Sequence, residues 1–415
     1  MLDAAATPPS PAVPSAVAAS RTSAALDNLR AVVILIVLAF HSMLAYLRWV
    51  PVAGAGFDVP PYAWRAFPIL DRYRFAGFDL FCAWQNVDLM ALLFFLSGLF
   101  VWNSLERKKD WGYLRDRVMR LGVPYVFGVM ILIPIAIYPA YRVTASDPAL
   151  SAYWRSLVAL PFWPNGPLWF LWQLLALNVA AGAIHAVTPG AIAALGRWSA
   201  AGARDPLRYA AGFLAVSALA YVPMAFAFTP WAWSDSGPFA VQFCRPPLYA
   251  VYFFAGVGVG RAGLERGLLA VDGVLARHWG LLLTVALGAL ALWIALTALT
   301  MNGTGAGIAL AADLSFVPAC LSGGGFLIAV CLRFLRRRSR FLGTLAANAF
   351  GLYIVHYLFV VWLQFALLEL PLYAVIKAAI VFAGTLSLSL ATVAAARRLG
   401  WGARLIGATP RAALS

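Results

Sequence analysis

The sequence predicts an all-α protein, a polytopic membrane bundle of about ten transmembrane helices. Three observations lead to this fold class. Of the 415 residues, 63% are hydrophobic and only 11% are charged, with a mean hydropathy of +0.82. Apolar stretches of about 18 residues or more, long enough to cross a bilayer as a helix, recur along the chain. The polar segments between them are too short to form a sizeable soluble domain.

The predicted spans form one membrane domain over residues 25–398. Their expected positions are 26–48, 82–103, 120–140, 167–188, 207–228, 246–264, 279–300, 307–331, 346–368 and 373–396. Residues 1–24, rich in Ala, Pro and Ser, lack the basic start and compact apolar core of a cleavable signal, so we expect a disordered tail. Residues 399–415 are expected to form a basic cytoplasmic tail.

The basic residues decide on which side of the membrane the termini lie. An even number of spans places both termini on one side, and the net charge is +15. If the N-terminus is inside, most Lys and Arg residues fall in cytoplasmic segments, as the positive-inside rule requires. These segments are 107–120, 197–208, 261–277, 333–340 and 397–411. We therefore expect both termini to be cytoplasmic in a multi-pass protein of the cell inner (plasma) membrane. The basic charge then indicates topology and contact with membrane lipids, and no nucleic-acid partner.

Arg30 and His41 are polar residues inside the first predicted span. They lie eleven positions apart, about three helical turns, so both side chains point the same way, roughly 16 Å apart along the axis. Such residues are costly in hydrocarbon and usually face the bundle interior on a functional path. His41 has two interpretations. It is either a buried histidine bonded to a neighbouring hydroxyl or carbonyl group, or a general base that takes a proton from an attacking hydroxyl.

His356 lies near the middle of the ninth predicted span. Its depth in the membrane differs from that of His41 by only about 8 Å on these boundaries, so we expect the two rings to share a cavity. Asp88 and Asp313 are the intramembrane carboxylates that could orient or stabilise an imidazole, or instead pair with an arginine. The sequence does not choose between them.

Arg115, Arg117 and Arg120 open the third predicted span. Arg117 and Arg120 are three residues apart and should share a helix face. Guanidinium groups suit bidentate binding of phosphate, which fits a nucleotide-bearing donor arriving from the cytoplasm. Arg30, near the inner end of the first span, could join this cluster. The alternative is a plain anchor that obeys the positive-inside rule.

Other features restrict the chemistry. The four cysteines are scattered, with no CxxC pair and no histidine at ligand spacing, so no zinc site, other metal site or disulfide framework is indicated. His185 and His278 lie near predicted inner ends, where a solvated role is expected. The long outer segments 49–81 and 141–166 are rich in aromatic residues, which indicates either an interfacial belt or a lid or sugar-stacking surface over the site.

The chain resembles the membrane acyltransferase 3 family. The residues that carry the resemblance are Arg30 with His41, Arg117 with Arg120 and the following Pro124, Phe94–Gly98, Leu168–Leu171 and Leu352–His356. Within the family, residues 27–30 and 99–124 look most like the branch that includes the glucan-modifying, succinyl-transferring C protein of osmoregulated periplasmic glucan synthesis. The resemblance covers about residues 26–396.

The resemblance implies a membrane O-acyltransferase with no bound cofactor. Its donor would be acyl-CoA, with the phosphates on Arg117, Arg120 and Arg30, and its acceptor would be a hydroxyl of an extracytoplasmic glycan. His41 would activate that hydroxyl or carry the acyl group covalently, and His356 or a carboxylate would orient it.

The alternative is a transporter or exporter of a small anion or lipid-linked sugar, which predicts helices broken in mid-membrane and internal symmetry. Residues 322–325, Ser-Gly-Gly-Gly in the eighth span, favour this alternative.

Overall fold

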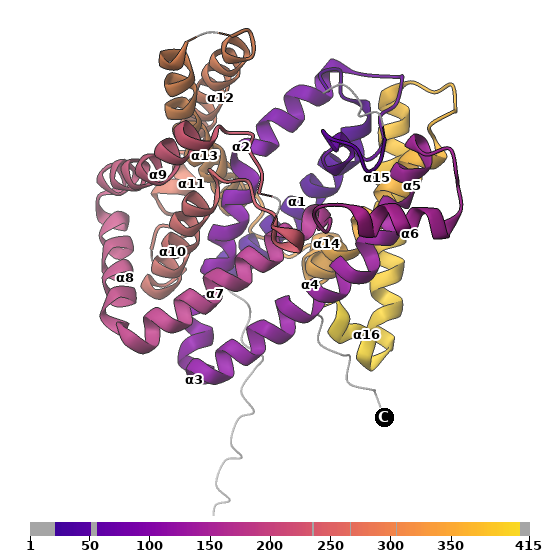
Figure 1. Ribbon diagram of the computed structural model, residues 1–415. Helices are drawn as coiled ribbons and strands as arrows, with labels where there is room; N and C mark the ends of the chain where they lie inside the picture. The colour runs from indigo at the N-terminus through magenta and orange to yellow at the C-terminus, as the bar shows by residue number, and fades with distance from the viewer. Residues whose placement is uncertain (1–20, 51–55, 235, 266, 304, 407–415) are drawn as a thin grey trace, which may run out of the picture.

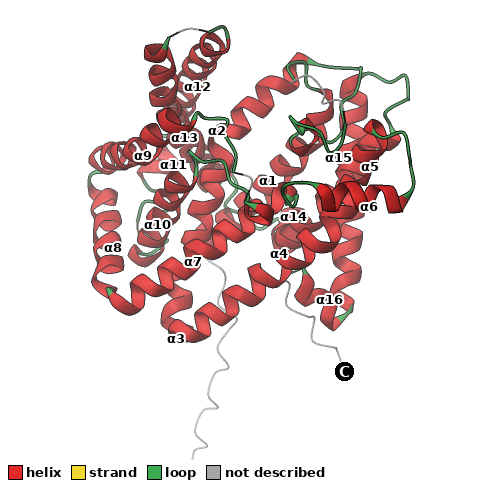
Figure 2. Cartoon of the chain, viewed as in Figure 1, coloured by secondary structure: helices red, strands yellow, loops and turns green. Residues whose placement is uncertain are grey.

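The fold is a bundle of helices (Figure 1). The computed structural model describes residues 21–50, 56–234, 236–265, 267–303 and 305–406. Figure 2 shows helices and loops, and the described residues contain no strand beyond one isolated bridge between Trp233 and Gln242. The predicted all-α fold class is therefore confirmed. Of the predicted tails, residues 1–20 and 407–415 lie outside the described residues.

Nine described helical segments are long and apolar enough to cross a membrane. They are α1 with η1 (Arg21–Tyr46), α2 (Ala76–Gly98), the run from α3 to α5 (Val101–Thr144), η5 with α7 (Gly166–Val187), α9 (Pro206–Phe228), α12 (Trp279–Met301), α13 (Ala306–Phe334), α14 (Arg340–Ala366) and α15 (Ala374–Arg398). The remaining predicted span corresponds to α10 (Pro246–Ala262), which has 17 residues. Each of the ten predicted spans thus coincides with a helix, and α1 begins at Arg21, earlier than expected.

The third predicted span is part of a longer, irregular helical run. α3 (Val101–Arg117) turns sharply at Lys109, whose φ of 55° is not helical. Two π-helical turns, η3 (Val118–Gly122) and η4 (Gly128–Leu132), then alternate with α4 (Val123–Phe127) and α5 (Ile133–Thr144). Because a π turn holds more residues than an α turn, these segments change which side chains share a face.

One predicted connection is a helix instead. Residues 189–204 were expected in a cytoplasmic loop but form α8 (Pro189–Arg204), which packs against α10. Small residues allow this approach: a Cβ on Gly258 would lie 2.7 Å from the Ser199 hydroxyl. The remaining helices are short: η2 (Ala63–Arg65), α6 (Leu150–Ala159), η6 (Gly237–Phe239), α11 (Val274–Arg277) and α16 (Gly400–Leu405).

Residues assigned to the inner side contact one another at one end of the bundle. The Asn28 amide donates hydrogen bonds to the carbonyl groups of Leu335 (2.6 Å) and Arg337 (2.9 Å). The Arg30 guanidinium lies 4.3 Å from the ring centre of Phe100. Figure 1 shows α3 and α16 at this same end, at the bottom of the view. The predicted alternation of spans therefore agrees with the packing.

Residues assigned to the outer side also meet. Lys377, at the start of α15, forms an ion pair of 2.6 Å with Asp71 of the first long outer segment, and neither side chain is exposed. The aromatic residues of the outer segments stack mainly on one another: Phe57 stacks on Trp64 at 4.5 Å and packs edge-on against Tyr141 and Tyr153. These four rings are buried and pack together as a small core, whereas Trp49 and Trp154 of the same outer segments are exposed; a belt, a lid and a sugar-stacking surface all stay open as predictions.

Candidate functional site

The structure brings His41 of α1 and His356 of α14 together. Their ring centres lie 4.9 Å apart with the planes at 65°. His356 is completely buried, whereas His41 keeps partial exposure. Two residues that lie 315 positions apart in the sequence therefore meet where α1 packs on α14, as their predicted depths suggested.

Hydrogen bonds fix the same tautomer in both rings. His41 Nδ1 lies 2.9 Å from the carbonyl oxygen of Val37, and His356 Nδ1 lies 2.7 Å from that of Tyr353. A carbonyl oxygen can only accept, so each Nδ1 carries the proton and each neutral ring keeps its lone pair on Nε2. His356 Nε2 is buried without a hydrogen-bond partner among the described residues. In each ring, Nε2 is therefore the nitrogen that can accept a proton.

Sequence reasoning missed two residues of α14 that hold the pair in place. The Tyr357 ring lies 5.8 Å from His41, edge to face. Gln364 donates from Nε2 to the His41 carbonyl group at 2.8 Å. Gln364 follows His356 by eight residues, which is about two turns along one helix face. That spacing was the sequence signal that could have placed Gln364 on the same helix face as His356.

Neither candidate carboxylate contacts the histidines. Asp88 is buried on α2 and faces α13, where Gly323 has no side chain and leaves room for the carboxylate. Both Asp88 oxygens are buried, with Trp84 on the preceding turn as the nearby donor. Among the described residues, no carboxylate lies within ion-pair distance of His41 or His356. The interpretation of Asp88 as an orienting partner of an imidazole is therefore not supported by the geometry.

Asp313 lies in a different environment, near a buried arginine. Arg245 is 3% exposed and is the charged group that acts on Asp313. Its guanidinium also lies 4.2 Å from the ring centre of Phe316 on α13 and 5.6 Å from that of Tyr221 on α9. The charge of Arg245 acts on Asp313, but no ion pair joins these two side chains, so pairing of Asp313 with an arginine stays a prediction.

The three arginines near the start of the third span differ in their surroundings. Arg115 is exposed. Arg117 stacks over Tyr113 at 4.9 Å, and its Nε is buried without a hydrogen-bond partner among the described residues. Arg120 is half exposed and donates from Nε to Asp116 at 3.0 Å. The π turn η3 begins directly after Arg117 and contains Arg120, and the charges of both arginines act on Asp116; that the two share one face stays a prediction.

Arg30 has different contacts from these three residues. It forms an ion pair of 3.2 Å with Asp27 and lies over the Phe100 ring. The other two histidines also lie where the sequence placed them, away from the paired rings. His185 contacts Asp110 at 2.7 Å, and His278 is bonded to the carbonyl group of Val274.

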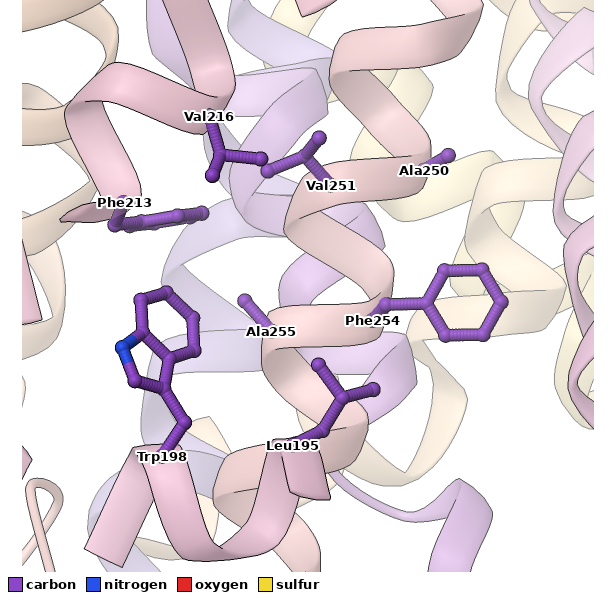
Figure 3. A pocket seen from close by; sticks show the side chains of 8 residues that line it. All are labelled: Leu195, Trp198, Phe213, Val216, Ala250, Val251, Phe254 and Ala255. Atoms are coloured by element: carbon purple, nitrogen blue, oxygen red, sulfur yellow. The ribbon is translucent and has the colours of Figure 1, made fainter. Parts of the chain in front are cut away.

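Outside the histidine pair and the arginines, the described residues offer mainly apolar features. All four cysteines are buried free thiols, and no group of three metal-ligating side chains was found within the described ranges. An apolar cavity of about 410 Å³ lies between α8, α9 and α10, lined by residues such as Trp198, Phe213 and Val251 (Figure 3). None of the predicted site residues lines it. The run of residues 322–325 does not break α13, which continues from Ala306 to Phe334, so the broken helix expected of a transporter is not found there.

Comparison with known proteins gives one match. A family model described as an acyltransferase domain matches residues 23–394. No curated protein and no solved structure matches the chain. The matched region contains the two paired histidines and all of the arginines described above.

Proposed function

The chain belongs to the acyltransferase 3 family and is a multi-pass membrane acyltransferase, and we propose that it moves an acyl group from cytoplasmic acyl-CoA to a hydroxyl of an extracytoplasmic glycan. The observation that carries this proposal is the pair of His41 and His356 inside the matched domain. The proposal places the enzyme in the cell inner (plasma) membrane with both termini in the cytoplasm.

His41 is the catalytic residue in this proposal. Its Nε2 removes the proton from the acceptor hydroxyl, whose oxygen attacks the thioester carbonyl carbon. The carbon–sulfur bond breaks, and the CoA thiolate takes the proton back from the imidazolium, which leaves an ester, free CoA and neutral His41. His356 is a positioning residue, because it packs against His41 and is completely buried.

A covalent route uses the same atoms in a different order. His41 Nε2 first attacks the thioester, releases CoA and holds the acyl group, which then passes to the hydroxyl. The mass of the intact protein, measured after incubation with acyl-CoA and no acceptor, separates the two routes. An added acyl mass that disappears in His41→Ala supports the covalent route, and its absence supports direct transfer.

The donor phosphates are assigned to arginines at the inner end. Arg117 and Arg120 are the principal candidates, with Arg115 and Arg30 contributing charge, since guanidinium groups bind phosphate strongly. Two observations support this assignment: Arg117 has an unpartnered Nε, and Arg115 has its side chain exposed. The acyl arm would extend from there into the bundle toward His41.

Mass spectrometry of envelope and secreted glycans tests the proposal. Cells carrying wild-type protein, His41→Ala, His278→Ala or a gene deletion are compared for an ester mass. We expect the ester with wild type and His278→Ala only. His278 is the matched control because it lies outside the paired site. An ester that persists in His41→Ala, with the protein inserted at wild-type level, overturns the assignment of His41.

A further inference from the structure

Tyr357 of α14 follows His356 directly and packs on both imidazoles. Its ring centre lies 5.8 Å from that of His41 and 6.4 Å from that of His356. The backbone of η5 also approaches this ring, because Gly166 has no side chain: a Cβ there would lie 3.2 Å from Tyr357 Cε1. Tyr357 is 6% exposed. Its ring is therefore held in one place beside the reactive histidine.

The hydroxyl group of Tyr357 is free although its ring is buried. Buried tyrosine hydroxyls usually find a hydrogen-bond acceptor, and the nearby Tyr353 hydroxyl donates to the Pro167 carbonyl group. Among the described residues, the Tyr357 hydroxyl has no hydrogen-bond partner, and unlike the unpartnered hydroxyl of Tyr252 it is not completely enclosed. A free donor therefore opens onto accessible space next to the histidine pair.

Tyr357 supplies what the two histidines lack, a free hydrogen-bond donor. In the described part of the chain, three aromatic rings pack on His41, those of Phe40, His356 and Tyr357. Phe40 has no polar hydrogen, and the Nδ1 hydrogen of His356 is already donated to the Tyr353 carbonyl group. A phenol keeps its proton at neutral pH. The Tyr357 hydroxyl can therefore donate to a substrate atom while His41 Nε2 accepts a proton.

We propose that Tyr357 is a second catalytic residue, whose hydroxyl donates a hydrogen bond to the carbonyl oxygen of the acyl group. This inference rests on the proposed function. When the acceptor oxygen attacks the thioester carbon, the π electrons of the carbonyl group move onto its oxygen. The Tyr357 hydrogen bond stabilises that negative charge without transferring its proton. The carbonyl group then re-forms as the carbon–sulfur bond breaks, and the electrons of that bond leave with the CoA sulfur.

Steady-state transfer by purified Tyr357→Phe tests this role, because the substitution removes the hydroxyl and keeps the ring. We expect kcat to fall about 100- to 1,000-fold, as when one donor to an oxyanion is lost, while KM for acyl-CoA changes little. The control is Tyr138→Phe, which loses a hydroxyl that donates to the Pro148 carbonyl group at 2.8 Å and should keep the wild-type kcat. An unchanged kcat in Tyr357→Phe overturns the proposal, and so does an equal loss of activity in Tyr138→Phe.

Carbethoxylation of His41 by diethyl pyrocarbonate is a second measurement, which needs neither acyl-CoA nor a glycan. The imidazole attacks a carbonyl carbon of the reagent, expels ethyl carbonate and loses its Nδ1 proton to solvent, so charge again develops on a carbonyl oxygen beside His41. Peptide mass spectrometry compares the rate at His41 with the rate at the exposed His278 in the same sample.

In Tyr357→Phe we expect the rate of carbethoxylation at His41 to fall about tenfold or more, with the rate at His278 unchanged. This ratio separates the proposal from the proposed function. If the wild-type protein transfers no acyl group, the proposed function fails and the ratio alone decides the role of Tyr357. An unchanged ratio then overturns that role, and a lower ratio supports it.

Discussion

His41 and His356 have different environments although their rings touch. His356 has no exposed surface, whereas His41 retains some. Only His41 is therefore accessible to a substrate, and His356 acts on the reaction through its packing and its free Nε2. Gln364 also fixes the backbone of His41, because its side-chain amide donates a hydrogen bond to the His41 carbonyl group. The reactive ring thus depends on α14 for its position.

His356→Ala should lower kcat about 10- to 100-fold, as is typical when a residue that orients a reactive group is removed. KM for acyl-CoA should change little, because the arginines assigned to the donor lie elsewhere. The measurement is steady-state transfer by purified enzyme, with His278→Ala as the control. A rise in KM with unchanged kcat would contradict a positioning role and place His356 in donor binding.

The buried ion pair of Asp71 and Lys377 should be important for stability. Neither side chain is exposed, and Lys377 also donates to the Leu368 carbonyl group at 3.1 Å. Lys377→Met leaves the Asp71 charge buried without its partner, which costs about 3–5 kcal/mol. We expect a lower melting temperature in detergent, with part of the loss recovered in Asp71→Asn combined with Lys377→Met. Equal melting of the single variant and wild type would show that the pair contributes nothing.

At the scale of helices, α2 and α10 pack closely because glycine lies at their interface. A Cβ on Gly98 would clash with the backbone carbonyl of Phe253, and one on Gly256 with that of Phe95. Small residues are the usual means by which membrane helices approach each other. α2 also carries Asp88 and leads to Phe100, on which Arg30 lies. The glycines therefore help to set the position of an inner-end arginine.

Gly256→Ala should destabilise the protein by about 1–3 kcal/mol, since the extra carbon meets backbone that cannot rotate away. Gly288→Ala in α12 is the matched control, because nothing lies within 4 Å of its Cβ position. Thermal unfolding in detergent compares the two variants. Similar melting temperatures for both would contradict close packing of α2 on α10.

The helices were largely predictable and their irregularities were not. Hydrophobic length alone located every predicted span, because a helix that crosses a bilayer needs about 20 apolar residues whatever its neighbours are. α8 was missed because Arg197 and Arg204 resemble loop charges, and its helix is stabilised by packing of small residues on α10. Hydrophobic length does not reveal the π turns η3 and η4 either, although each directly precedes a helix with proline at its start, Pro124 or Pro134, which cannot donate a backbone hydrogen bond.

At the scale of the whole molecule, the sequence identified the histidine pair but not the partner of each charged residue. Depth in the membrane can be counted along a helix, so His41 and His356 could be matched. The direction in which a side chain points around the helix axis cannot be counted in this way, because it depends on how the helices pack. Asp88 therefore faces Gly323 instead of an imidazole, and Asp313 lies in the field of the buried Arg245. An apolar groove lined by Val118, Gly122 and Leu175 is likewise visible only in three dimensions.

The orientation of the whole bundle decides whether the donor can reach its arginines. The positive-inside rule places Arg107 in the cytoplasm and Tyr373 outside; both are exposed, Tyr373 by 79%. The native cysteines are buried, so single variants Arg107→Cys and Tyr373→Cys can be labelled selectively. A membrane-impermeant maleimide applied to spheroplasts should label Tyr373→Cys at once and Arg107→Cys only after permeabilisation. The opposite pattern would place Arg115, Arg117 and Arg120 outside, where cytoplasmic acyl-CoA cannot bind, and would exclude the proposed direction of transfer.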